Sequence, residues 1–428
     1  MSSNQSPLEE EQQQHLTPKP IDPAQMDLWV NARSPPIDGW EAVQKFDPGS
    51  DSSTELVSGQ LRIGDQRTRR LLIVGDVHGH LPELKRLLDK IGFDREAGDH
   101  VILVGDLVNK GPDSAGVVQF AMDMGAHAVK GNNEDRILLA VEALRSGKVQ
   151  REKAREEERQ ETSSSNNETE GNSNAAVPSD RNEVLPNLLK TDFDTVASLT
   201  DSQIAWLSSL PAILDMGLFT NATKPPWNAG TIVVAHAGLI PDVPLAEQDP
   251  WAVANMRSLV YPPHDLEKEV LREAVMKAAR KRVKGQPPNW PVTDEEMDEE
   301  LKRLAAEGHS LKASETSASQ RRMTIPIEGS DGDLWRDAWN RKQNLLQTAS
   351  ERMVVVYGHD AKAGVQVEPE VDIREGGDDA KVVRGVRYAF GLDSGCVYGR
   401  HLTALVIEAR PEDGSVVHRI EQVEHDKE

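Results

Sequence analysis

Apolar residues in the middle of the chain follow two alternating patterns. The segments 71–79 (LLIVGDVHG) and 100–108 (HVILVGDLV) each begin with a continuous apolar run and then reach glycine and aspartate, which is typical of a buried strand. Each is followed by a helical pattern, at 81–92 and at 113–125. A third unit of the same kind begins at 126–145. Three strand and helix units in a row indicate an α/β fold with parallel strands and right-handed crossovers.

Four later apolar runs predict further strands, which can pair as the second half of the core. They are TIVVAHAGL (231–239), MVVVYGHD (353–360), YAFGLDSG (388–395) and LTALVIEAR (402–410).

Polar segments interrupt this core. Residues 1–69 are polar and proline-rich, so we expect an extension that is mostly disordered or laid over the surface. The domain itself is expected to span 70–425. Within it, Ser/Asn/Glu low complexity predicts a disordered insertion at about 146–185, and charged stretches predict a helical insertion at about 262–330.

The composition limits which cellular compartment and which binding partners we expect. The chain has 428 residues, a formal net charge of −22 and a mean hydropathy of −0.54. A polyanion repels nucleic acid and anionic lipid, so we expect no stable binding to either. The single cysteine, Cys396, excludes an internal disulfide framework and is interpreted as a small buried hydrophobe in a reducing compartment. Since we find neither a basic-then-apolar leader nor an apolar run of about 18 residues, we expect a cytoplasmic protein.

Polar side chains with ligand chemistry follow five of the predicted strands. They are Asp76, His78, Asp106, Asn132, His236 and His359. Because the carboxyl ends of neighbouring strands border one crevice, we expect these six N and O donors to lie together. Carboxylates, imidazoles and an amide suit divalent Mn, Fe, Zn, Co or Ni. Six donors are enough for two ions, and Asp106 is placed to bridge them about 3.5–4 Å apart.

Each of these residues alone has an ordinary explanation. His78 could be a loop histidine, Asp76 a helix cap and His236 a hydrogen-bonded core histidine. Their joint occurrence at strand ends favours a dimetal site. No thiolate stands with them in the sequence, which argues against a closed structural zinc site.

Five sequence blocks carry a resemblance to a known family. They are GDVHG (75–79), GDLVNKGP (105–112), GNNE (131–134), AHAGL (235–239) and YGHD (357–360). In this order they resemble the signature blocks of the calcineurin-like metallophosphoesterases. The lysine in GDLVNKGP and the late block LDSGCVYGRHLTAL are most similar to the ApaH-like phosphatases, relatives of diadenosine tetraphosphatase and fungal endopolyphosphatase. The resemblance covers about 71–145, 200–261 and 335–408.

The resemblance implies a fold and a ligand set. The fold is an α/β metallophosphoesterase β-sandwich flanked by helices, with a dimetal site at the carboxyl ends of the strands. Asp76 and His78 would hold the first metal and Asp106 would bridge. The ligands of the second metal would be Asn132, His236 and His359. A water or hydroxide between the two metals would be the nucleophile.

Two basic residues are candidates for binding phosphate. Lys110 stands where protein phosphatases of the family carry an arginine, and it offers a mobile point charge in place of a planar fork. Arg257 is the candidate for a second phosphate clamp, with an ordinary surface arginine as the alternative.

Two asparagines stand where most relatives carry an acid pair. In those relatives a histidine protonates the departing oxygen and an aspartate orients it, whereas this chain has Asn133 and Asn109. Taken alone, GNNE could also be a turn or a helix cap. An asparagine donates a hydrogen bond but delivers no proton at neutral pH. His127 is an alternative acid, although it opens its strand and the site lies at the strand's far end.

The missing acid directs the prediction of the substrate. Acid catalysis matters most for a strongly basic leaving group such as a serine alkoxide, whereas phosphate departs unaided. We therefore expect a metal-dependent phosphohydrolase that favours polyphosphate, dinucleoside polyphosphates or capped ends. A protein Ser/Thr phosphatase is the first alternative, and a catalytically weak, metal-bound scaffold that recognises phosphorylated partners is the second.

Three further residues have two interpretations each. Trp335 and Trp339 could stack on a nucleobase, but their spacing is also typical of a buried helical face. Asp393 is expected to orient a ligand histidine or to cap a turn.

Overall fold

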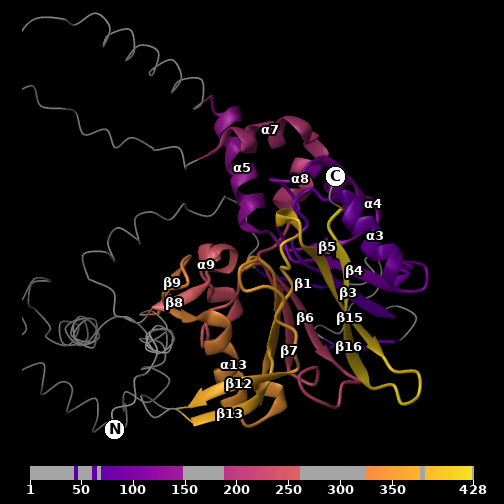
Figure 1. Cartoon of the computed structure of the whole chain (residues 1–428), viewed down its shortest axis with the longest axis vertical. Coiled ribbons are helices and arrows are strands. Elements are labelled where there is room, and N and C mark those ends of the chain that lie inside the picture. Colours follow the sequence, from indigo (N-terminus) through magenta and orange to yellow (C-terminus); the bar gives the residue numbers. More distant parts are fainter. Residues whose placement is uncertain are drawn as a thin grey trace, which may run out of the picture.

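Two β-sheets packed against each other form the centre of the protein (Figure 1). The computed structural model describes six segments of the chain, which are residues 43–46, 60–64, 69–147, 188–260, 324–375 and 381–426.

The first sheet has five strands in the order β16, β15, β3, β4, β5. Their bounds are β3 Arg70–Val74, β4 Asp99–Leu103, β5 His127–Ala128, β15 His401–Ala409 and β16 Val416–Glu424. The strands β3, β4 and β5 are parallel, as their strand and helix pattern predicts. The late run 402–410 does not join the other late strands, because β15 pairs antiparallel with β3.

The second sheet has the order β1, β6, β7, β11, β14, with β2 also paired to β6. Its strands are β1 Val43–Lys45, β2 Gln60–Leu61, β6 Ile213–Phe219, β7 Thr231–Ala235, β11 Met353–Tyr357 and β14 Ala389–Gly391. Here β7, β11 and β14 are parallel. Two smaller units stand beside the sandwich, formed by β8 Ser258–Val260, β9 Ile325–Ile327 and β10 Asp333–Leu334, and by β12 Glu370–Glu375 and β13 Lys381–Val386.

The strand β3 shows why its sequence is apolar throughout. Its side chains alternate between two cores: Leu71 and Ile73 pack between the sheets, whereas Leu72 and Val74 pack against helices on the other side. Both faces are covered, so no polar position is needed on either face.

Helices cover both sides of the sandwich. On the outer side of the first sheet lie α3 Leu81–Ile91, α4 Ser114–Asp123, α5 Asn132–Arg145 and α8 Asp201–Ser209, with α7 Lys190–Ser198 against α4 and α5. The helices α9 Pro250–Asn255 and α13 Trp335–Leu345 pack against the second sheet. The expected sandwich flanked by helices is confirmed (Figure 1). Among the described segments, no helix has both the length and the apolar character needed to cross a bilayer.

Parts of the expected extension and insertions belong to this core. The strands β1 and β2 lie within 1–69, and both pair parallel with β6. Phe46 and Ile63 beside them are buried in the core between the sheets. The strand β9 lies at the end of 262–330 and pairs with β8. Residues 1–42, 47–59, 65–68, 148–187 and 261–323 lie outside the described residues.

Candidate metal and phosphate site

The loops at the carboxyl ends of five strands border one cavity of about 420 Å³. Asp76 and His78 follow β3, Asp106 follows β4, and His359 follows β11. The lining residues are Asp76, His78, Asp106, Lys110, Asn132, Arg257, Glu328, His359, Asp360, Ala361, Lys362, Asp393, Tyr398 and Arg400. Asn132 is the first residue of α5. His236 follows β7 and contacts this cluster from behind.

Asp106 lies at the centre of the candidate ligands. Its Oδ2 is 3.4 Å from Nε2 of His78, and its Oδ1 is 3.3 Å from Nε2 of His236. Donor atoms of Asp76, His78 and Asp106 lie within 4.8 Å of one another. One carboxylate therefore faces imidazoles from two different sheets, which is the position that a bridging ligand requires.

A backbone carbonyl contacts one ring nitrogen of each of the three histidines. Because a carbonyl only accepts, that nitrogen carries the proton and the other offers its lone pair. The contacts are His78 Nδ1 to Val108 O at 3.2 Å, His236 Nδ1 to Val104 O at 2.9 Å, and His359 Nε2 to Asn255 O at 3.0 Å. Such contacts fix the tautomer and orientation of metal-binding histidines, so the residues present fit divalent cations.

Several acceptor atoms lie close together around Asp106. With its proton on Nδ1, His236 turns the Nε2 lone pair toward Oδ1 of Asn132 at 3.1 Å and Oδ1 of Asp106 at 3.3 Å. At His78 the lone pair of Nε2 faces the ammonium of Lys110 at 3.1 Å, which is itself a cation. The lone pair of His236 thus lies among acceptor oxygens, where positive charge is favoured, and that of His78 already faces a cation.

Burial and neighbouring charges shift the pKa values of several candidate ligands. Burial, followed by the charges of Asp393 and Asp106, raises the pKa of Asp76 well above its usual value. Burial lowers the pKa of His78 to about 4 and lowers that of His359, so both rings are neutral at pH 7. Neutral imidazoles and crowded carboxylates are the state that cation binding relieves.

The backbone is strained at the same place. Within the described segments, six residues other than glycine have positive φ, and five of them lie in this site. The five are His78, Asp106, Asn109, Lys110 and His359. Strain of this kind clusters at functional sites because the surrounding structure must compensate for it. It is a signal of function independent of the sequence motifs.

The buried carboxylate of Glu134 holds two of the loops, a role the sequence did not reveal. It accepts backbone N–H groups from Asp106, Leu107 and Val108 in the loop after β4. It also accepts the N–H of Gly131 at the start of α5. Its place three residues after Gly131, in the capping-box position, was the available signal.

Basic side chains form part of the cavity lining. Lys110 and Arg257 line it, as expected for phosphate ligands. Arg257 is held by donating to the carbonyls of Glu328 at 3.1 Å and His359 at 3.2 Å. The sequence did not point to Lys362, Tyr398 and Arg400, which come from the loops after β11 and β14.

Neither asparagine of the substituted acid pair lines the cavity. Asn133 donates its side-chain amide to Oδ2 of Asp106 at 2.6 Å and accepts from Nδ2 of Asn109 at 3.2 Å. Asn109 Nδ2 also donates to Asp192 at 2.8 Å. His127 is not a lining residue either, and it packs its ring against Phe46 with centroids 4.7 Å apart.

The remaining sequence candidates have structural roles. Trp335 and Trp339 are 2% and 4% exposed in the core, so the buried-face interpretation is confirmed. Asp393 accepts the N–H of Gly395 at 3.0 Å and so caps a turn, and it also lines the cavity. Cys396 is 1% exposed in the core beneath the helices.

Comparison with known proteins identifies the family. The calcineurin-like phosphoesterase family matches residues 69–313, and the chain belongs to it. The chain is therefore a metallophosphoesterase, a class of hydrolase whose family implies divalent metals.

Several similar proteins carry one name. The symmetrical bis(5'-nucleosyl)-tetraphosphatase of Nitrosospira multiformis is 24% identical over 346 residues, which is 79% of this chain and 92% of that protein. The protein of the same name from Aromatoleum aromaticum is 25% identical over 341 residues, 79% of this chain and 93% of the relative. A crystal structure of a metallophosphoesterase from Sphaerobacter thermophilus aligns with 83% of this chain and 88% of its own at 14% identity and a TM-score of 0.33.

Proposed function

We propose that the chain hydrolyses phosphoanhydride bonds of substrates with several consecutive phosphates, using two divalent cations. The proposed ligands are Asp76, His78, Asp106, Asn132, His236 and His359, with Asp106 shared. The observation that carries the proposal is the pair of histidine lone pairs turned toward opposite oxygens of Asp106. When bound, the cations supply an activated water and the positive charge that favours attack at phosphorus.

The basic residues in the cavity lining support a polyphosphate chain as substrate. Lys110, Arg257, Lys362 and Arg400 present four cationic side chains around about 420 Å³ in a protein of net charge −22. A chain of phosphates carries a matching row of negative charges. The names of the two relatives support dinucleoside polyphosphates in particular, and inorganic polyphosphate and capped ends share the same bond.

The substituted acid pair supports an anhydride over an ester of serine. Asn133 is bound to Asp106 and delivers no proton to a leaving group. Cleaving an anhydride releases phosphate, whose second pKa near ~6 makes protonation unnecessary. The substrate class therefore matches the residues that are present.

A metal and substrate panel tests this proposal. The protein is first stripped of metal with a chelator and then reloaded with Mn²⁺, Co²⁺ or Zn²⁺. It is assayed with p-nitrophenyl phosphate, diadenosine tetraphosphate, polyphosphate, capped RNA and a phosphoserine peptide. We expect turnover only with metal, and at least ~100-fold faster cleavage of anhydrides than of the peptide, which is the lower range of acid catalysis. Equal or faster cleavage of the peptide would identify a Ser/Thr phosphatase. If metal-loaded protein turned over none of these compounds, the result would favour the alternative of a catalytically weak, metal-bound scaffold.

Recognition of a nucleobase is tested separately, with a substitution of Tyr398. This ring lines the cavity and is 64% exposed, so it offers a face on which a base can stack. Tyr398→Ala should raise KM for diadenosine tetraphosphate and leave KM for inorganic polyphosphate unchanged. An equal change for both substrates would show that Tyr398 has no role in base recognition.

A further inference from the structure

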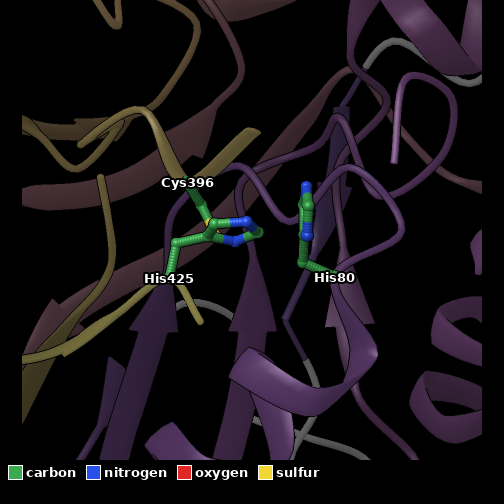
Figure 2. Close-up of side chains that lie close together, drawn as sticks. All are labelled: His80, Cys396 and His425. Carbon is green, nitrogen blue, oxygen red and sulfur yellow. The ribbon is translucent and has the colours of Figure 1, made fainter. Parts of the chain in front are cut away.

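A second cluster of side chains that could hold a metal ion includes His80, in the loop that follows β3. Figure 2 shows His80, Cys396 and His425 close together, with His80 from the indigo part of the chain and the other two from the yellow part. One ring nitrogen of each histidine and the sulfur of Cys396 lie within 4.8 Å of one another. None of the three lines the cavity of the phosphate site.

The cluster joins three segments that are distant in the sequence. His80 precedes the first residue of α3, Cys396 begins a short 3₁₀ turn between β14 and β15, and His425 follows β16. The two imidazole rings meet edge to face with centroids 4.8 Å apart. The tertiary fold alone therefore assembles this ligand set.

Helix capping does not account for the burial of His80. His80 occupies the N-cap of α3, where Ser, Thr, Asp or Asn is preferred, and its side chain makes no capping hydrogen bond. His80 is only 7% exposed. Within the described residues, Nε2 of His80 and Nδ1 of His425 are buried without a hydrogen-bond partner. Buried polar atoms without partners are costly, and a cation at the cluster would give one nitrogen of each ring a partner.

A buried carboxylate supplies charge beside the cluster. Glu83 is 3% exposed, with Oε1 3.3 Å from Nδ1 of His425 and Oε2 3.9 Å from Nδ1 of His80. A thiolate and this carboxylate together balance the charge of a divalent ion. One sulfur and two imidazole nitrogens are the donors that zinc and its analogue cobalt prefer.

We propose that His80, Cys396 and His425 bind one zinc-class divalent ion, with Glu83 beside it, at a structural site separate from the phosphate site. Coordination replaces the proton of the Cys396 thiol, which leaves to solvent, and no electron is transferred. The bound ion ties the end of the chain and the 3₁₀ turn to the start of α3, two residues beyond His78.

The single cysteine makes a sharp test possible. The proposed phosphate site contains no sulfur ligand, so thiolate-to-cobalt charge-transfer absorption in the near ultraviolet reports only on Cys396. Burial raises the pKa of this thiol to about 12, so without a cation it remains protonated and gives no thiolate signal at pH 7.5. The full-length protein is stripped with chelator and titrated with Co²⁺.

We expect the thiolate band to reach a plateau once the two proposed cations of the phosphate site and the one ion of this cluster are bound, and to be displaced by Zn²⁺. Cys396→Ser should lose the band and keep cobalt-dependent phosphohydrolase activity. His425→Gln, near the end of the chain, should weaken the cobalt affinity of the band at least ~10-fold. The matched control is His418→Gln, a half-buried histidine of β16 outside the cluster, which should keep the band. A folded, cobalt-loaded wild-type protein without the band, or a band unchanged in His425→Gln, would overturn the proposal.

Discussion

Asn133 holds the central carboxylate of the candidate site with two hydrogen bonds. Its backbone N–H donates to Oδ1 of Asp106 at 3.0 Å, and its side-chain amide donates to Oδ2 at 2.6 Å. Both oxygens of Asp106 are thereby oriented toward the flanking histidines. We infer that Asn133 is a positioning residue for Asp106 and does not act on the leaving group.

Restoring the acid pair should change the preferred substrate. Asn109 Nδ2 already donates to Asp192, so a second carboxylate at 109 would face a like charge. We therefore combine Asn133→His with Asn109→Asp and Asp192→Asn, which moves one carboxylate and keeps the charge. Turnover of a phosphoserine peptide should rise at least ~10-fold relative to polyphosphate, because general acid catalysis is regained.

The matched control for that variant carries only Asn109→Asp and Asp192→Asn. It lacks the new imidazole and should show no gain on the peptide. Metal content is measured for both proteins, since Asn133 also orients Asp106. A gain that is equal with and without the histidine would contradict the acid argument.

Removing the shared ligand should abolish both metal binding and activity. Asp106→Asn keeps the shape of the side chain but takes away the charge between His78 and His236. Since even outer hydrogen-bond partners of metal ligands are worth 10–100-fold, we expect kcat to fall by more than ~100-fold. Elemental analysis should find fewer bound ions per chain. Asp194→Asn, the same change on an exposed helix, is the control and should behave as wild type.

His418 should give the protein an acid-sensitive stability. Burial lowers its pKa, and Nδ1 accepts the indole N–H of Trp227 at 3.1 Å, which requires an unprotonated nitrogen. The unfolded chain binds a proton as the pH falls through ~6.5, whereas the folded chain does so only at lower pH. Stability from this group is therefore complete above pH 6.5 and decreases below it.

His418→Gln tests this dependence because glutamine can accept the same indole N–H without titrating. Urea unfolding at pH 7.5 and at pH 5 is compared for the two proteins. The loss of unfolding free energy on acidification should be smaller in the variant. An identical loss in both would show that His418 does not contribute to it.

The interface between the sheets should be sensitive to lost volume. Ile73 on β3 has no exposed surface and packs between the two sheets. Ile73→Ala should lower the free energy of unfolding by ~2–5 kcal/mol, and the matched change Ile73→Val by only ~0.5–1.5 kcal/mol. Chemical denaturation checks both values. Equal losses of unfolding free energy in the two variants would mean that neighbouring residues move into the space left by the alanine.

The sequence predicted the central strands well, and it placed the candidate ligands at the ends of these strands for the same reason. A strand covered on both faces, such as β3 or β11, must be a continuous apolar run, and the polar residue after it must lie at the sheet's end. The edge strands β1 and β2 carried no such signal, because VQK and QL are not apolar runs and form strands only by pairing with β6.

Contacts between distant loops could not be predicted in this way. Lys362, Tyr398 and Arg400 reach the cavity from separate turns, and no spacing in the sequence relates them. Cys396 was correctly expected to be buried, but its neighbours His80 and His425 come from opposite ends of the described core. Such groupings depend on how the sheets and their connecting turns pack.

The sequence by itself determined which residues end the buried strands, since burial on two faces dictates an apolar run and the strand's end dictates where polar chemistry begins. Only the tertiary structure decided which nitrogen of each histidine is free, where the amide of Asn133 points, and that a lone cysteine stands beside two histidines. These depend on backbone carbonyls and side chains brought together across the sandwich, where local sequence exerts no control.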